Sequence, residues 1–188
     1  MTIKNNIQDI RVVKLPQQTI YISSSNLYNS MFSNLAKTHD KIVLVVDKKF
    51  WEIFWDLVKQ SIEKHASAKF IDYLLLDAKT TTKTTISIDY ILQYMHSLVL
   101  SRNSCVVAIW WGYVWDLVWV ATGLYMRGID FYQCPTTLMA QCDSIIWKVA
   151  ANLGSYKNVI WLFRSPKATY CNIDCLKTLP SSELYVAF

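Results

Sequence analysis

Apolar runs and polar breaks alternate along the chain in the pattern of strands and helices that follow one another. Residues 41–46 (KIVLVV) and 105–109 (CVVAI) are continuous apolar runs, mostly β-branched, which is typical of strands buried on both faces of a parallel sheet. Residues 50–65 instead place an apolar side chain every three or four positions, which predicts a helix. Two more helices are predicted at 26–37 and 88–100, and one more strand is predicted at 70–76.

Two short apolar segments precede these elements and predict a β-hairpin. Residues 11–15 and 19–23 flank Pro16, and a proline has no backbone N–H for a central strand, which favours the edge of a sheet. The β-α-β-α alternation after them predicts a parallel sheet with helices on both faces. We therefore expect one α/β domain over residues 1–188, with a Rossmann-like parallel sheet and an N-terminal β-hairpin.

Composition and charge narrow the possible partners. Hydrophobic residues make up 53% of the chain and charged residues 18%, which favours a compact fold over disorder. The formal net charge is +5, but the 19 lysines and arginines are scattered from Lys4 to Lys177 without a basic run, so we expect no nucleic-acid partner.

Cysteine and histidine spacing bears on location and metal binding. The five cysteines are an odd number without a C-x-x-C pair, and the first residues lack the apolar run of a signal peptide. We therefore expect reduced thiols and a cytoplasmic protein. The three histidines, His39, His65 and His96, stand in separate segments, so we expect no metal site from this chain alone.

The segment after residue 105 carries an ordered series of polar and glycine motifs. The series consists of Gly112, Asp116, Tyr125, RGI at 127–129, PTT at 135–137, AQCDS at 140–144, Lys148, Asn152, KN at 157–158 and LKTLP at 176–180. In kind and order these motifs resemble those of 3-dehydroquinate synthase and its sugar-phosphate cyclase relatives. The resemblance extends to residue 183 and is only architectural before residue 105.

The resemblance implies a fold and an activity. Members of the family bind NAD in an N-terminal domain and zinc or another divalent metal in a helical C-terminal domain, with a sugar phosphate between the two. It implies a lyase of the shikimate pathway, which makes aromatic amino acids, in which transient oxidation by NAD precedes phosphate elimination and ring closure. The chain then corresponds to the dinucleotide-binding N-terminal domain, without the helical domain and the metal ligands. We therefore expect it to be inactive alone, and a homodimer is compatible with the resemblance.

The resemblance also assigns site residues by position. For NAD these are Asp47, Lys83, Gly112, Asp116, Thr136, Thr137, Lys148, Lys157, Lys177 and Thr178. For substrate and catalysis they are Arg127, Asp143, Lys148 and Asn158, with Arg127 and Lys148 holding anionic groups. Independently of the resemblance, a carboxylate that ends a strand, such as Asp47, suits the ribose hydroxyls of a nucleotide. The structural alternatives are a helix cap for Asp116 and for Thr136 and Thr137, and a solvated surface for Arg127 and Lys148.

Tryptophan stands at six positions where the family pattern has glycine. These are residues 110, 111, 115, 119, 147 and 161. A glycine turn between strand and helix lets the backbone approach a diphosphate, and an indole fills that space. Family membership predicts NAD binding, whereas the tryptophans predict weak or absent dinucleotide binding, so an inactive scaffold or an altered variant stays an alternative. Two related cyclases, 2-deoxy-scyllo-inosose synthase and valiolone-type synthases, are alternatives for the activity.

The same stretch permits a membrane alternative. Residues 106–126 contain one charge, Asp116, and have the length of a spanning helix. A carboxylate at the centre of such a helix costs about 3 kcal/mol on insertion, so we favour the α/β domain and expect no membrane partner.

Overall fold

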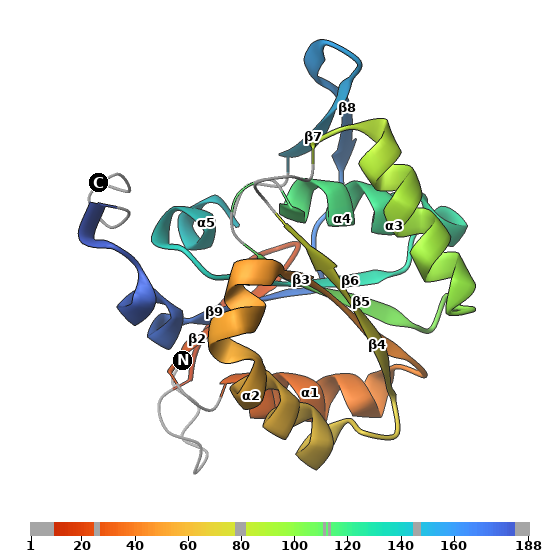
Figure 1. Ribbon diagram of the computed structural model, residues 1–188. Helices are drawn as coiled ribbons and strands as arrows, with labels where there is room; N and C mark the ends of the chain where they lie inside the picture. The colour runs from red at the N-terminus through yellow and green to blue at the C-terminus, as the bar shows by residue number, and fades with distance from the viewer. Residues whose placement is uncertain are drawn as a thin grey trace.

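A seven-stranded sheet forms the centre of the protein (Figure 1). The computed structural model describes residues 10–24, 27–77, 82–110, 112, 114–144 and 148–182. The strand order is β1-β2-β9-β6-β5-β3-β4, and all neighbours are parallel except β1 and β2, which form the hairpin. The strands are β1 (Arg11–Lys14), β2 (Thr19–Ser23), β3 (Ile42–Asp47), β4 (Phe70–Leu76), β5 (Cys105–Trp110), β6 (Asp130–Pro135) and β9 (Ala168–Asn172).

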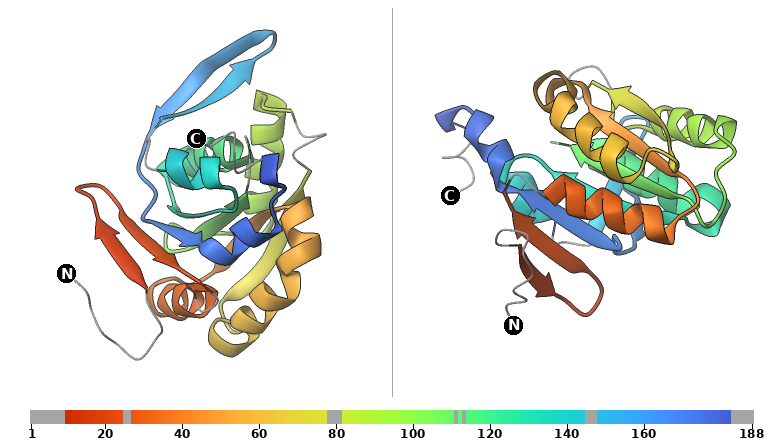
Figure 2. Two further views of the ribbon diagram at one scale, coloured as in Figure 1. Left: turned by 90° about the vertical axis from the view of Figure 1, so that its left-hand side faces the viewer. Right: turned by 90° about the horizontal axis from the view of Figure 1, so that it is seen from below.

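Helices cover both faces of this sheet (Figure 2). On one face lie α1 (Leu27–Thr38) and α2 (Lys48–His65), and on the other lie α3 (Thr85–Ser97) and α4 (Val114–Leu124). Three short elements are α5 (Leu138–Asp143), η1 (Tyr125–Arg127) and η2 (Ile173–Thr178). The predicted Rossmann-like architecture with its N-terminal hairpin is confirmed.

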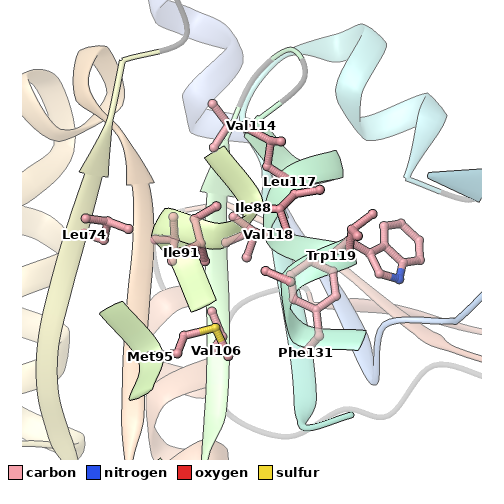
Figure 3. Packing of buried hydrophobic residues seen from close by; sticks show 14 of the residues in the cluster. Leu74, Ile88, Ile91, Met95, Val106, Val114, Leu117, Val118, Trp119 and Phe131 are labelled. Carbon is pink, nitrogen blue, oxygen red and sulfur yellow. The ribbon is translucent and has the colours of Figure 1, made fainter. Parts of the chain in front are cut away.

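The central strands explain why the chain folds in two layers around the sheet. All six residues of β3 and of β5 are buried, and successive side chains point to opposite faces. Val106 and its same-face neighbours pack with α3 and α4, where Ile91, Met95 and Leu117 meet them (Figure 3). Val107 and its same-face neighbours pack with α1 and α2. The continuous apolar runs therefore have a helix layer on each side.

A second, two-stranded sheet projects from the body (Figures 1 and 2). It pairs β7 (Lys148–Leu153) with β8 (Tyr156–Phe163) in antiparallel fashion. Alternate residues of β8, including Trp161 and Phe163, are exposed, and β7 packs on α4 through Val149 and Ala151. The hydrophobic pattern alone does not predict this hairpin, because β8 has no fully buried face.

Two sequence predictions differ from the structure. The helix predicted at 88–100 begins at Thr85 and ends at Ser97, because its first turn is mostly exposed, including Ile86, and does not extend the buried apolar stripe. The membrane alternative for 106–126 is wrong, since this stretch divides into strand β5 and the 11-residue helix α4. Among the described residues, no helix has both the length and the apolar character needed to cross a membrane.

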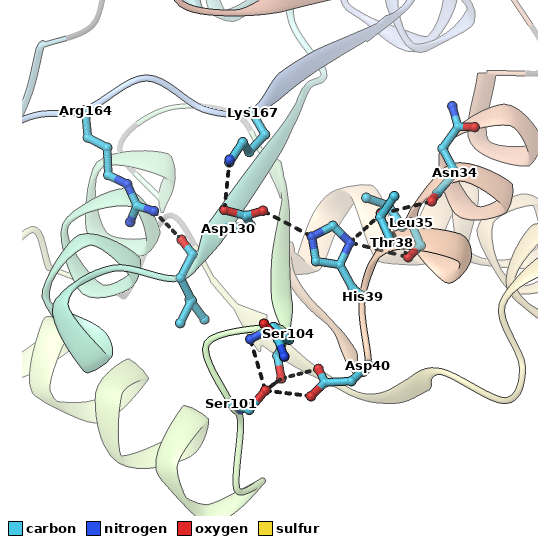
Figure 4. Close-up of polar contacts among 12 residues, drawn as sticks. Asn34, Leu35, Thr38, His39, Asp40, Ser101, Ser104, Asp130, Arg164 and Lys167 are labelled. Atoms are coloured by element: carbon cyan, nitrogen blue, oxygen red, sulfur yellow. Dashed lines mark hydrogen bonds and ion pairs between the residues drawn. The ribbon is translucent and has the colours of Figure 1, made fainter.

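Polar contacts fasten the loops at the amino ends of the strands (Figure 4). Asp130 contacts His39 Nε2 at 3.3 Å and Lys167 Nζ at 3.4 Å. Nearby, Asp40 accepts hydrogen bonds from the hydroxyls of Ser101 at 2.5 Å and Ser104 at 2.7 Å. Burial acts to raise the pKa of Asp40, but the two serine hydroxyls and backbone N–H groups outweigh it and hold that pKa below its ordinary value.

The turn before β6 depends on a glycine and an arginine. Gly128 has φ +104, and a Cβ there would lie 2.9 Å from Nη1 of Arg164. The same guanidinium donates to the carbonyl oxygens of Thr122 at 3.0 Å and Ile129 at 2.6 Å. The RGI motif thus has a structural role, since a side chain at residue 128 would displace Arg164.

Candidate functional site

The chain reverses its direction of winding between β3 and β5. From β3 it passes through α2 to β4 on one side, and from β5 it passes through α4 to β6 on the other. In open α/β sheets, ligands bind outside the carboxyl ends of the strands at such a point. The residues that end these two strands are Asp47 and Trp110. The fold therefore directs attention to this edge.

A pocket of about 510 Å³, open to solvent, lies at this edge on the α2 side. Asp47, Thr136, Thr137 and Thr178 contribute its polar groups. Lys49, Phe50, Ile53, Phe54, Cys175, Leu179 and Pro180 complete the lining. An apolar lining with a few polar groups is typical of small-ligand sites.

Asp47 has both a structural and a ligand-facing position. Its Oδ1 accepts hydrogen bonds from the backbone N–H groups of Lys49 at 3.0 Å and Phe50 at 3.2 Å, which caps α2. The residue is only 2% exposed and still lines the pocket. Sequence analysis placed it at the end of its strand, and the structure agrees.

The two threonines after β6 are also engaged in the fold. The N–H and hydroxyl of Thr136 donate to the carbonyl oxygen of Trp110 at 3.0 and 2.8 Å, which joins the ends of β5 and β6. Thr137 Oγ1 accepts from the Ala140 N–H at 3.2 Å and caps α5. The N-cap alternative is confirmed for Thr137, and both side chains border the pocket.

A second polar cluster lies at the first turn of α4 and joins three of the predicted residues. Lys83 Nζ is 2.7 Å from Asp116 Oδ2 and 3.2 Å from Asn158 Oδ1. The Ala150 N–H donates to Asp116 Oδ1 at 3.2 Å. Burial raises the pKa of Asp116, and the opposing effect of Lys83 and the Ala150 N–H is smaller. Asp116 is therefore held by β7 and Lys83.

The remaining predicted residues are distributed over several places. Gly112 has φ +67 in an exposed turn where an added Cβ would meet nothing within 4 Å. Asp143 is exposed at the end of α5, and Lys157 is exposed in the projecting hairpin. Lys177 pairs with Asp174 at 2.6 Å and is not part of the pocket lining. Lys148 begins β7, and its side chain lies outside the described part of the chain.

Arg127 lies at the opposite edge of the sheet from these residues. It ends η1, three residues before β6 begins, and has φ +66. Because β5 and β6 are parallel, this position is at their amino ends. One copy of the chain therefore does not bring Arg127 to the pocket or to the Lys83 cluster.

Sequence reasoning did not assign Phe50, Phe54, Leu179 or Pro180 to a site. The helical period explains the two phenylalanines as helix core, and only their place in the first two turns after Asp47 indicates contact with a ligand. Leu179 and Pro180 belong to the LKTLP motif and approach the pocket because η2 returns the chain to this edge.

Three of the tryptophans form an aromatic stack on the α4 side of the edge, which we name the tryptophan stack: Trp110, Trp115 and Trp119. The first two rings are parallel within 12° at 4.8 Å, and Trp119 follows at 5.1 Å. Trp119 also meets Phe131 at 5.5 Å (Figure 3). Within the described chain, the buried indole N–H groups of Trp110 and Trp119 have no hydrogen-bond partner. Trp111 and Trp147 lie outside the described residues.

No group of three or more His, Cys, Asp or Glu side chains in the described ranges is arranged to hold a metal ion. The described site consists of the pocket on the α2 side of the sheet, and of the Lys83 cluster and the tryptophan stack beside α4.

Comparison with solved structures defines the class of the fold. The chain superposes on 2-deoxy-scyllo-inosose synthase, complexed with carbaglucose-6-phosphate, NAD+ and Co2+, with a TM-score of 0.81 and 19% identity over 95% of this chain and 50% of that one. It also superposes on 2-epi-5-epi-valiolone synthase from Streptomyces hygroscopicus subsp. jinggangensis 5008, with NAD+ and Zn2+ bound, with a TM-score of 0.75 and 20% identity over 94% and 48%. The fold is that of the N-terminal half of sugar-phosphate cyclases.

Sequence comparison then identifies the family. The model of the 3-dehydroquinate synthase N-terminal family matches residues 73–186. The 3-dehydroquinate synthase of Alkaliphilus metalliredigens is 36% identical over 146 residues, and that of Helicobacter hepaticus is 46% identical over 98. The chain belongs to the 3-dehydroquinate synthase family. The match to the Alkaliphilus protein covers 77% of this chain but only 40% of that protein. The match to the Helicobacter protein covers 52% of this chain and 28% of that protein.

Proposed function

We propose that this chain is the nucleotide-binding N-terminal domain (residues 1–188) of a 3-dehydroquinate synthase, and that its pocket receives the adenosine half of NAD. The observation that carries the proposal is the pocket at the carboxyl edge, with the Asp47 carboxylate beside the apolar side chains of α2. A carboxylate at the end of a strand accepts hydrogen bonds from ribose hydroxyls, and apolar and aromatic side chains suit an adenine ring. The pocket therefore fits adenosine.

The turn between β5 and α4 does not fit the diphosphate of NAD. A diphosphate needs bare peptide N–H groups at the start of the helix, and here the buried indole of Trp110 and the partly buried indole of Trp115 stand at that place. We derive no chemical step through the cofactor. For the parent enzyme we propose the lyase reaction of the family, the phosphate-eliminating cyclisation of a seven-carbon sugar phosphate, which requires a metal-binding domain beyond this chain.

We propose that the substrate is bound and turned over by Arg127, Asp143, Lys148 and Asn158. Asn158 has a fixed position, because its N–H donates to Asn152 Oδ1 at 2.9 Å and its side chain accepts from Lys83. Arg127 reaches a substrate at the carboxyl edge only from a second copy of the chain, and for this reason we propose a homodimer. A cytoplasmic location belongs to the same proposal.

Titration with adenosine tests the pocket. Asp47→Asn keeps an oxygen that can cap α2 but removes the negative charge, and we expect it to weaken adenosine binding about tenfold, the loss of one charge-assisted hydrogen bond. Asp56→Asn, an exposed position on the same helix, is the matched control. Equal weakening in both variants, or no adenosine binding by the unaltered chain, contradicts the proposal.

A non-catalytic relative of the synthases is the second candidate, and the tryptophan stack favours it. The two candidates differ in whether phosphate release returns when the C-terminal half of the Alkaliphilus synthase is supplied with this chain. Release at a rate above that of either half alone supports the lyase, and its absence with both halves folded and associated supports the non-catalytic relative.

A further inference from the structure

We infer that this chain holds a dinucleotide by its adenosine half only, because the tryptophan stack occupies the seat of the diphosphate. The inference rests on the proposed function, since it takes the pocket as the adenosine site. Beyond the proposed function, we infer that the diphosphate and the nicotinamide half of NAD contribute nothing to binding.

The stack stands at the turn where a diphosphate would have to lie. Trp110 is the last residue of β5, and Trp115 lies in the first turn of α4. At such a turn the peptide N–H groups and the helix N-terminus bind phosphate only if no side chain separates them from it. Trp110 is 1% exposed and its ring is stacked on that of Trp115, so an indole pair covers the junction of strand and helix.

Packing fixes the stack in this place. Trp119 is fully buried and meets both Trp115 and Phe131, which belongs to the adjacent strand β6. Moving the rings aside would open a void in the core between β5 and α4, and close-packed interiors resist such voids. The unpartnered N–H groups of Trp110 and Trp119 show that ring packing, not hydrogen bonding, holds these indoles.

Charge at the same turn also disfavours a phosphate. The carboxylate of Asp116 is at the start of α4, and it forms a close ion pair with Lys83 at 2.7 Å. Lys83 is further held by Asn158. The positive charge that contacts this turn is therefore already neutralised, and a diphosphate would have to compete with a buried carboxylate for it.

Calorimetric titration of the unaltered chain with adenosine and with NAD tests the inference. We expect the two dissociation constants to agree within about threefold, because both ligands use the same contacts. NAD binding more than about tenfold tighter than adenosine overturns the inference and leaves the proposed nucleotide pocket in place. Binding of neither ligand overturns both, so the two failures are distinguishable.

A variant pair tests the role of the stack. In Trp110→Gly/Trp115→Gly we expect NAD to bind at least about tenfold tighter than before, with adenosine unchanged. Trp161→Gly, at an exposed position in β8, is the matched control and should leave the ratio of the two constants unchanged. If circular dichroism shows that the double variant is unfolded, Trp115→Gly alone replaces it, since Trp115 is only partly buried. A folded variant without a gain for NAD overturns the inference.

Discussion

Two strand-to-helix turns at the same edge of the sheet have opposite characters. At the β3–α2 turn, the strand ends in Asp47, whose short side chain caps the helix and borders the pocket. At the β5–α4 turn, the strand ends in Trp110, whose buried ring stacks on that of Trp115. The two strands are parallel neighbours, so both end at the same edge of the sheet.

The difference indicates that side-chain volume at the end of a strand, and not topology alone, bears on whether this edge can receive a ligand. The chain matches a cyclase fold with a TM-score of 0.81 although one of the two turns is filled. A fold therefore transfers the place of a site but not its capacity to bind.

The largest effect is expected for the filled turn. Trp119→Ala removes a fully buried indole between α4 and β6, and we expect a loss of about 3–5 kcal/mol in the free energy of unfolding. Urea unfolding measures it, with Trp161→Ala at the exposed hairpin as control, where about 0.5 kcal/mol or less is expected. A loss below about 1 kcal/mol for Trp119→Ala would mean that the stack is not part of the core.

The open turn should respond less. Asp47→Ala deletes the two cap hydrogen bonds of α2, and we expect it to lower the free energy of unfolding by about 1 kcal/mol. Asp47→Asn keeps an oxygen that can cap α2, so its loss in the free energy of unfolding should be clearly smaller than that of Asp47→Ala. Thermal unfolding separates the two variants, and equal losses would show that the charge of Asp47, not its cap, stabilises the fold.

A smaller effect is expected when the ring is kept and the N–H is removed. Trp119→Phe loses part of the packing but also a buried donor without a partner, and we expect the two to offset within about 1 kcal/mol. Both Trp119→Phe and Trp119→Ala lack the indole N–H, so the difference between them in the same urea series reports the packing of the aromatic ring. A loss as large as that of the alanine variant contradicts this balance.

The smallest effect concerns the amino edge, which touches neither turn. The folded pKa of Asp40 lies below its unfolded value, so its contacts stabilise the protein above the unfolded pKa and are lost as pH falls through the folded pKa. Ser104→Ala removes one hydrogen bond to Asp40 and should reduce the acid sensitivity of stability by well under about 1 kcal/mol, because Asp40 is exposed. Unfolding between pH 6 and pH 3 measures the change, and an unaltered pH dependence is the contrary result.

Local pattern was sufficient for much of the fold. The uninterrupted runs at 42–47 and 105–110 are buried because each strand has a helix layer on both sides, and such strands need no alternation. The helical period of α2 likewise reflects a single buried stripe. The position of Asp47 at the edge of the sheet was predictable because the end of a central strand is fixed by the strand itself.

Long-range contacts account for what the sequence did not reveal. The Lys83–Asp116–Asn158 cluster joins three elements, and no local pattern relates residues 33 and 42 positions apart. The separation of Arg127 from the other predicted residues follows from the direction of α4, which carries the chain from one edge of the sheet to the other. The contacts of the tryptophans depend on the same packing of α4 on β5 and β6.

The spacing of the stacked indoles has an optical consequence. Trp119 is tilted by 55° to Trp115 at 5.1 Å, and Trp110 lies 4.8 Å from Trp115, so the electronic transitions of the three rings couple and add an exciton couplet to the far-ultraviolet circular dichroism. That couplet overlaps the helical bands, so a helix content read from the spectrum of this protein is distorted. Its amplitude is, in return, a label-free gauge of whether the three rings remain together.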